Sequence, residues 1–186
     1  MDKKITGLIL AGMLLLFTAC GGSKSMVKSY VRENADLGLI RTIAVLPFEG
    51  GGRAPRHREL TITQLLSSGI FEVVDKGRVD YILQQEAITA GTPLDSFTLR
   101  RLGEMLEVNA VLHGSVEQVS ESRGSSVFPE ITMTMRLIEC ESGQLLWQAS
   151  GKGSGYSLAD RLFGFAPKDS FQVTLKLLDD LFSTMQ

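Results

Sequence analysis

The order of the apolar segments constrains the fold of this chain more than any other feature. Residues 41–49 (RTIAVLPFE) form a short apolar run that ends at Pro47 and leads into three glycines, which is typical of a buried strand entering a loop. Strand-like runs and segments with helical spacing of apolar residues then alternate, which predicts strand–helix–strand–helix–helix–strand. The predicted elements after the first strand are helix 59–69, strand 70–75, helices 77–88 and 96–107, and strand 109–119.

The remainder of the chain predicts an antiparallel hairpin and a closing helix. Residues 131–140 (ITMTMRLIEC) alternate apolar and polar side chains, a turn follows, and residues 145–153 return as a second strand. In residues 169–186, Asp169 and Gln172 resemble a helix capping box. We therefore expect a single α/β domain over residues 39–186, with helices against a mixed sheet of about five strands.

The amino terminus predicts export and lipid attachment. Residues 5–19 are an apolar run of 15 residues after Lys3 and Lys4, shorter than the ~20 residues that a membrane-crossing helix needs, so residues 1–19 are predicted to be a cleaved signal peptide. Thr18-Ala19-Cys20 resembles the lipobox of bacterial lipoproteins, which implies acyl chains such as palmitate on Cys20. The alternative is an ordinary secretory signal that leaves Cys20 a free thiol.

The segment after Cys20 predicts a tether and a location. Residues 20–38 are mostly polar and lack sustained periodicity, which indicates a lipidated, flexible N-terminus. Gly21 stands where an Asp would imply retention at the inner membrane, so the resemblance favours the periplasmic face of the outer membrane. The covalent lipid is the only cofactor predicted. The formal net charge of −2 gives no reason to expect nucleic acid binding.

The glycine-rich stretch at residues 49–60 (EGGGRAPRHREL) is the main candidate binding site. A glycine loop between a strand and a helix can present backbone N–H groups to phosphate, but this loop lacks the Gly-Lys-Ser/Thr ending of a P-loop. Arg53, Arg56, His57 and Arg58 crowd a predicted helix N-terminus, where the helix dipole disfavours positive charge. We expect an anionic partner, which could be a lipid headgroup, a cell-wall polymer or an acidic protein face. The alternative is a mobile, solvated loop.

Other candidate residues are weaker. Phe163 and Phe165 lie in a Gly- and Pro-containing segment, residues 161–167, where exposed aromatic rings could contact a partner or the membrane, although covering the core is the commoner role. His57 and His113 are the only histidines and lie far apart, without a Cys or carboxylate cluster at metal-ligand spacing. The sequence therefore predicts no metal site, no catalytic residues and no small-molecule substrate.

Several segments together resemble the CsgG family, the outer-membrane lipoproteins that form the curli secretion channel. They are PFE (residues 47–49), FEVVDKGRVDYILQQE (71–86), LGEMLEVNAVLHGSVEQV (102–119) and RLIECESGQLLWQASGKG (136–153). Peptidoglycan-synthase activator lipoproteins use a related fold. The resemblance implies the domain fold, a lipid anchor and self-assembly. It does not imply a pore, because residues 120–130 and 154–168 are too short and too polar for the two spanning hairpins of a channel subunit.

The main functional expectation is a non-enzymatic, CsgG-like accessory lipoprotein that assembles with itself or with envelope proteins for secretion or surface structures. The first alternative is a lipoprotein regulator of peptidoglycan synthesis, and the second is an oligomeric secretion channel subunit. The sequence leaves open the identity of the partner, the oligomeric state, any secreted cargo, and whether residues 120–130 and 154–168 contact the membrane.

Overall fold

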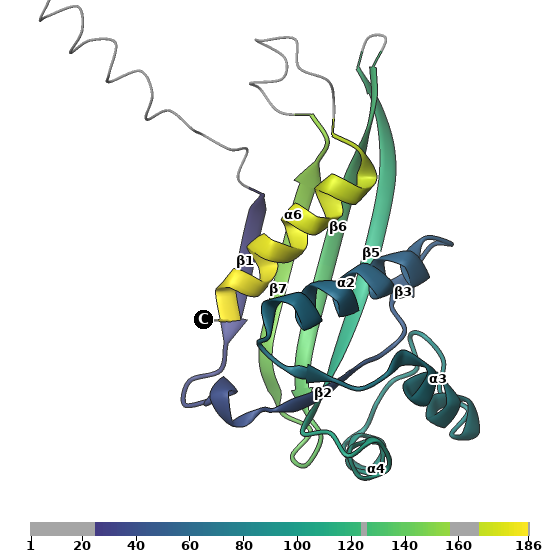
Figure 1. The fold of residues 1–186 in the computed structure, drawn as a ribbon, viewed down its shortest axis with the longest axis vertical. Helices are drawn as coiled ribbons and strands as arrows, with labels where there is room; N and C mark the ends of the chain where they lie inside the picture. The colour runs from purple at the N-terminus through teal and green to yellow at the C-terminus, as the bar shows by residue number, and fades with distance from the viewer. Residues whose placement is uncertain (1–24, 124–125, 157–167, 186) are drawn as a thin grey trace, which may run out of the picture.

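The fold is built on a seven-stranded mixed sheet (Figure 1). The structure, a computed structural model, describes residues 25–123, 126–156 and 168–185. Its elements are β1 (Met26–Val31), η2 (Leu37–Leu39), β2 (Thr42–Val45), β3 (Glu49–Gly50), α2 (Ala54–Ser68), β4 (Glu72–Val73), α3 (Lys76–Gln85), α4 (Ser96–Leu106), β5 (Ala110–Arg123), β6 (Ser126–Glu139), β7 (Leu145–Ser154), α6 (Ser170–Phe182) and η3 (Ser183–Met185).

The strand order is β1-β7-β6-β5-β2-β4, and β3 pairs with β5. Strands β2, β3 and β4 form the parallel part, while β5, β6, β7 and β1 form antiparallel pairs. The predicted single α/β domain with a mixed sheet is confirmed, but the sheet has seven strands rather than about five. Among the described residues, none of the helices is long and apolar enough to cross a membrane.

The first additional strand, β1, lies in the segment that was expected to be a flexible tether. Residues 26–31 pair antiparallel with β7 from Met26↔Lys152 to Val31↔Trp147. Only Val27 among the residues of this strand packs against the core, so the sequence shows no apolar alternation. The strand is held mainly by backbone pairing at the sheet edge, and the part of the chain available as a tether is correspondingly shorter than residues 20–38.

The hairpin formed by β5 and β6 is also longer than expected. The third predicted strand continues past Val119 to Arg123, and its partner begins at Ser126 rather than Ile131. Pairing is continuous from Ala110↔Glu139 to Arg123↔Ser126. Residues 120–130, which were expected to be a connecting segment, are therefore mostly strand. Their polar composition hides the two-residue period on which strand prediction depends.

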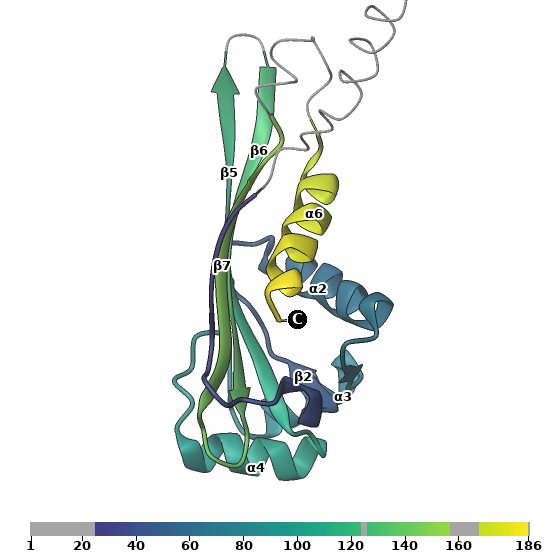
Figure 2. The same ribbon diagram turned by 90° about the vertical axis from the view of Figure 1, so that its left-hand side faces the viewer.

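Helices cover the two faces of the sheet unequally (Figure 2). Helices α2 and α6 pack on one face, where the core includes the fully buried Trp147 and the aliphatic residues Leu65 and Leu177. The Trp147 indole N–H donates a hydrogen bond of 3.0 Å to Thr184 Oγ1. On the other face, a second apolar cluster joins α3 and α4 to Ala44 and Val111 at one end of the sheet. Alternate residues of β2 and β5 thus serve opposite cores.

The helix ends follow the capping rules that the sequence indicates. Asp75, Asp95 and Asp169 each accept a hydrogen bond from a backbone N–H in the first turn of α3, α4 and α6 respectively. Gly69 ends α2 in the left-handed conformation, with φ of 65°. The cap predicted at Asp169 is confirmed. In contrast, Arg53 at the N-cap position of α2 makes no side-chain capping hydrogen bond.

We predict that Gly103→Ala destabilises the domain by about 1–3 kcal/mol, because the added methyl group would overpack the site. An added Cβ at this position of α4 would lie 2.6 Å from Cys140 Cβ and 3.3 Å from Val108 O. The measurement is urea unfolding. Gly52→Ala is the control, because nothing lies within 4 Å of its added Cβ, and equal stability of the two variants would contradict the close packing of α4 on β6.

Candidate functional site

The glycine-rich segment forms one wall of a pocket between the loop after β3 and strand β5. The pocket has a volume of about 470 Å³ and is lined by Gly50, Gly51, Gly52, Arg53, Ala54, His57, Val116, Glu117 and Gln118. Gly50 has φ of 137°, and an added Cβ there would lie 2.1 Å from Val116 O. Glycine is required at this position because the chain passes against the backbone of β5.

The four basic residues predicted to share this site fall into two groups. Arg53 and Arg56 are exposed. His57 and Arg58 are 3% and 4% exposed and lie on the side of α2 that packs against the sheet. The helix therefore separates the exposed Arg53 and Arg56 from the buried Arg58, while the buried His57 lines the wall of the pocket.

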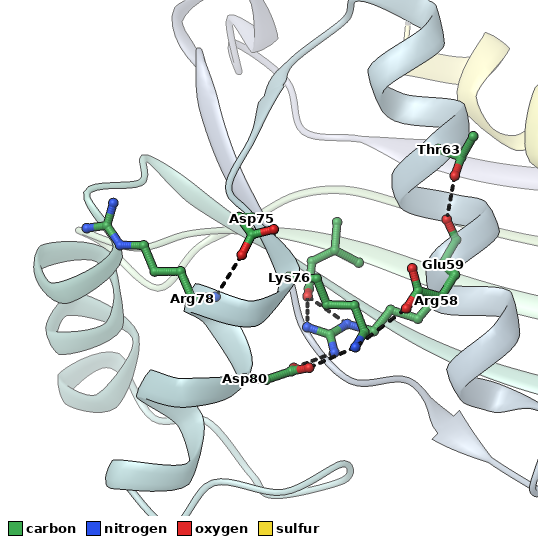
Figure 3. Close-up of polar contacts among 8 residues, drawn as sticks. Arg58, Glu59, Thr63, Asp75, Lys76, Arg78 and Asp80 are labelled. Carbon is green, nitrogen blue, oxygen red and sulfur yellow. Dashed lines mark hydrogen bonds and ion pairs between the residues drawn. The ribbon is translucent and has the colours of Figure 1, made fainter.

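Arg58 binds groups within the protein (Figure 3). Its Nε and Nη2 donate to the Val45 carbonyl oxygen at 3.0 and 2.7 Å. Its Nη1 donates to Asp80 Oδ1 at 2.5 Å. The guanidinium therefore joins α2 to the end of β2 and to α3. The prediction that Arg58 binds an external anion is wrong, because its buried donors already have acceptors in the fold.

Lys76 extends this network toward the surface. Its Nζ lies 3.0 Å from Asp80 Oδ2 and 3.5 Å from Glu59 Oε1. Partial burial raises the pKa of the Asp80 carboxyl, but hydrogen bonds from Arg58 and Lys76 outweigh that effect and the pKa lies below its usual value. The hydrogen bond to Asp80 raises the pKa of Lys76. Lys76 and Asp80 therefore remain charged at neutral pH.

His57 also has partners inside the domain. Its Nε2 lies 3.1 Å from Gln118 Oε1 on β5, and its Nδ1 lies 3.4 Å from Thr174 Oγ1 on α6. Burial lowers the pKa of the imidazole, and the nearby Arg56 and Arg53 lower it further against the effect of Gln118. The ring is neutral at pH 7 and connects α2, β5 and α6. Although His57 lines the pocket, both ring nitrogens have partners within the domain, and anion binding by this residue stays a prediction.

Residues that the sequence did not single out meet on the other face of the sheet. Glu49 Oε1 lies 3.2 Å from His113 Nε2, beside Ser115, Thr134 and Arg136 in a small pocket. Burial lowers the pKa of His113, and the effect of Glu49 in the opposite direction is smaller. The His113 side chain is partly buried. The position of Glu49 beside His113 could not be predicted, because Glu49 lies on β3, a strand of only two residues.

The remaining potential ligands and nucleophiles of the described residues are also accounted for. Among the described residues, no group of three or more His, Cys, Asp or Glu side chains could hold a metal ion. Burial raises the pKa of the Cys140 thiol to about 12, which leaves it protonated and unreactive. Cys20, Phe163 and Phe165 lie outside the described residues, so lipid attachment and the aromatic contact stay predictions.

The amino-acid sequence matches a known protein family. Residues 60–152 match the family model described as peptidoglycan-synthase activator LpoB, which is half of the chain. The chain belongs to the LpoB family. The match supports the relation to peptidoglycan-synthase activators that the sequence suggested as an alternative, and the predicted CsgG-like identity receives no support. No curated protein matches the sequence.

Solved structures with the same fold come from several bacteria. The PelC dodecamer from Paraburkholderia phytofirmans has a TM-score of 0.52 at 15% identity, covering 85% of this chain and 96% of that one. Lipoprotein GNA1162 from Neisseria meningitidis has a TM-score of 0.53 at 18% identity, covering 67% and 91%. The hypothetical protein CT253 from Chlamydia trachomatis has a TM-score of 0.50 at 14% identity, covering 78% and 95%. At these identities the comparison shows a shared fold alone.

We predict that Arg58→Ala lowers the free energy of unfolding by about 2–4 kcal/mol, because it leaves the Val45 carbonyl without its donor and removes a buried ion pair. Arg53→Ala is the matched control at the exposed N-cap of the same helix and should change stability by less than about 0.5 kcal/mol. Chemical denaturation of both variants measures the difference. If both variants were as stable as the wild type, the structural role of Arg58 would be wrong.

Proposed function

We propose that this protein is a non-enzymatic lipoprotein regulator that activates a peptidoglycan synthase by direct contact, held at the periplasmic face of the outer membrane by acyl chains on Cys20. The observation that carries the proposal is the family match over residues 60–152. This segment runs from α2 to β7 and includes most of the sheet. The neutral, internally bonded histidines and the protonated Cys140 support a role in binding.

The position of β1 sets the distance between the domain and the membrane. Only five residues, 21–25, lie between Cys20 and Met26. Fully extended, they span about 17 Å. The chain enters β1 from the side of the sheet on which the β5–β6 hairpin turns, with Met26 level with Glu117 and not with the hairpin tip. Helix α4 lies at the opposite end (Figure 1). An anchored domain therefore directs its hairpin end toward the lipid, and the synthase has to extend to this level.

Arg53 and Arg56 are the proposed partner contacts of the glycine-rich site. Both are exposed at the amino end of α2, beside the pocket formed by residues 50–54. Positive charge at this helix end is unfavourable unless an anionic group lies nearby. We assign that group to an acidic surface of the synthase. Phe163 and Phe165 remain proposed as an additional contact.

The test is reconstitution of the lipoprotein with a purified peptidoglycan synthase of the same bacterium. The wild-type protein should bind the synthase and increase glycan polymerisation or peptide cross-linking. Arg53→Glu with Arg56→Glu should weaken binding at least about tenfold, because two attractive contacts become repulsive. Arg41→Glu with Arg100→Glu reverses two other exposed arginines and is the matched control.

The possible results separate the sources of the anion. Absence of binding and activation by the wild type would overturn the proposed function. If the Arg53/Arg56 variant still activates the synthase but no longer binds anionic vesicles or isolated peptidoglycan, then the two arginines contact a lipid headgroup or the cell wall, and the synthase contact lies elsewhere.

The lipid anchor has its own test. Metabolic labelling with a palmitate analogue should label the wild type, and Cys20→Ser should abolish the label and move the protein from the membrane fraction to the soluble periplasmic fraction. Cys140→Ser is the control and should keep the label, because this residue is buried in the domain. Unlabelled wild-type protein would favour the ordinary secretory signal.

A further inference from the structure

One face of the sheet lacks a helical cover over much of its length. In Figure 2 the sheet is seen close to edge-on, with α2 and α6 on one side and α4 across the lower end. Among the described residues, the opposite side above α4 carries the side chains of β1, β7, β6, β5 and β3. Residues that pair across neighbouring strands point to the same face, so these side chains form rows across the sheet. We call this surface the open face.

Two rows of the open face begin with a lysine and end with a glutamate. The pairing of the first row runs through Lys28 (β1), Ser150 (β7), Thr134 (β6), Ser115 (β5) and Glu49 (β3). The second row runs through Lys152 (β7), Thr132 (β6) and Glu117 (β5). In each row, the lysine and the glutamate are the same number of strands away from β6. Positive charge thus lies on one side of β6 and negative charge on the other.

Contacts within the face hold its polar side chains in place. Thr134 Oγ1 and Ser150 Oγ lie 2.8 Å apart. Lys152 Nζ lies 2.5 Å from Glu130 Oε1. The four charged ends of the rows nevertheless remain accessible, because the Lys152 and Glu49 side chains are 53% and 46% exposed and Lys28 and Glu117 are also exposed. The face is therefore an ordered surface on which each row keeps its lysine apart from its glutamate, with Lys152 beside Glu130 and Glu49 beside His113 in the same copy.

We infer that the open face is a self-association surface that pairs two copies of this chain face to face. A two-fold rotation about a line along β6 exchanges the lysine side with the glutamate side. Lys28 of each copy then faces Glu49 of the other, and Lys152 faces Glu117. The other two-fold rotation in the plane of the sheet, about a line across the strands, places lysine over lysine. Charge complementarity therefore selects the first arrangement.

The same rotation preserves the direction of the strands. Both copies then direct the start of β1 to the same end, so the two lipid anchors enter the same membrane through tethers of only five residues. Lysine-over-lysine packing would send the anchors in opposite directions. This step rests on the proposed anchor at Cys20, whereas the charge argument does not.

The ends of β6 and the apolar side chains of the face fit this arrangement. Arg136 and Glu130 lie on β6 near the axis, so each approaches the same residue of the other copy. Twisted sheets that pack face to face cross at about 30° and diverge away from the centre, which separates these like charges. Within one copy, Arg136 donates to Gln148 Oε1 at 3.0 Å, and Glu130 contacts Lys152. Met26, Tyr30 and Val119 are 76%, 51% and 46% exposed on this same face and add apolar area to the contact.

The test uses charge reversal in solution. The protein is the full mature chain from residue 20 with Cys20→Ser, so that micelles do not contribute, and analytical ultracentrifugation gives its mass over a concentration series. The wild-type sequence should form a dimer that weakens with salt. Lys28→Glu with Lys152→Glu, and separately Glu49→Lys with Glu117→Lys, should each raise the dissociation constant by more than about 100-fold, because like charges then face each other.

Mixing the two reversed proteins provides the decisive result. Every facing pair is again opposite in charge in the mixture, so a dimer containing one copy of each should form although neither protein dimerises alone. If circular dichroism shows that a double variant does not fold, the experiment is repeated with the single variants Lys28→Glu and Glu49→Lys. Arg41→Glu with Arg100→Glu makes the same charge change as the lysine variant at exposed residues outside the two rows and should leave the dimer intact.

Two results would overturn the inference: a wild-type monomer at every concentration and ionic strength, or reversed variants that still dimerise. Neither result bears on synthase activation, which the reconstitution measures with the lipidated protein. Conversely, failure of activation with an intact, charge-dependent dimer would remove the proposed function and leave the self-association surface standing.

Discussion

The placement of the helices around the sheet depends on one buried guanidinium. Arg58 extends from α2, which covers one face, to the carbonyl oxygen at the end of β2 and to Asp80 on α3, which belongs to the cluster on the other face. A buried arginine is tolerated only where acceptors satisfy its donors, so its environment allows few alternative positions for these three elements. The same contact holds the amino-terminal half of α2 against the sheet. Arg53 and Arg56 are then fixed on the exposed side, next to the glycine loop.

The parts of the fold that could be predicted are those in which apolar side chains carry the pattern. Strands β2, β6 and β7 and helices α3, α4 and α6 were expected close to their observed positions, because each buries a regular stripe or face. Strand β1 and the outer part of the β5–β6 hairpin were not expected. They are held by backbone hydrogen bonds between mainly polar residues, and such pairing depends on a neighbouring strand that no local sequence pattern reveals.

The sequence analysis grouped the basic residues of the candidate site by charge instead of by helical position. The buried residues of α2 are Ala54, His57, Arg58, Thr61 and Leu65, which follow the three- and four-residue spacing of one helix face. Extending that spacing backward from Leu65 would have placed His57 and Arg58 inside. The polar types at these positions concealed the stripe, and the adjacent Leu66 lies off it and is 57% exposed. Burial is therefore decided by position on the helix even for charged residues.

Membership of the activator family and the recognition of a partner rest on different parts of this chain. The family match spans residues 60–152 and so includes α3, α4 and most of the sheet. Strand β1, the glycine loop with Arg53 and Arg56, and helix α6 lie outside that segment. The match therefore supports the fold of residues 60–152 and the relation to peptidoglycan-synthase activators. The elements nearest the predicted anchor and the exposed arginines contribute the orientation and charge that a partner would meet, and these follow from the geometry of this chain rather than from its family.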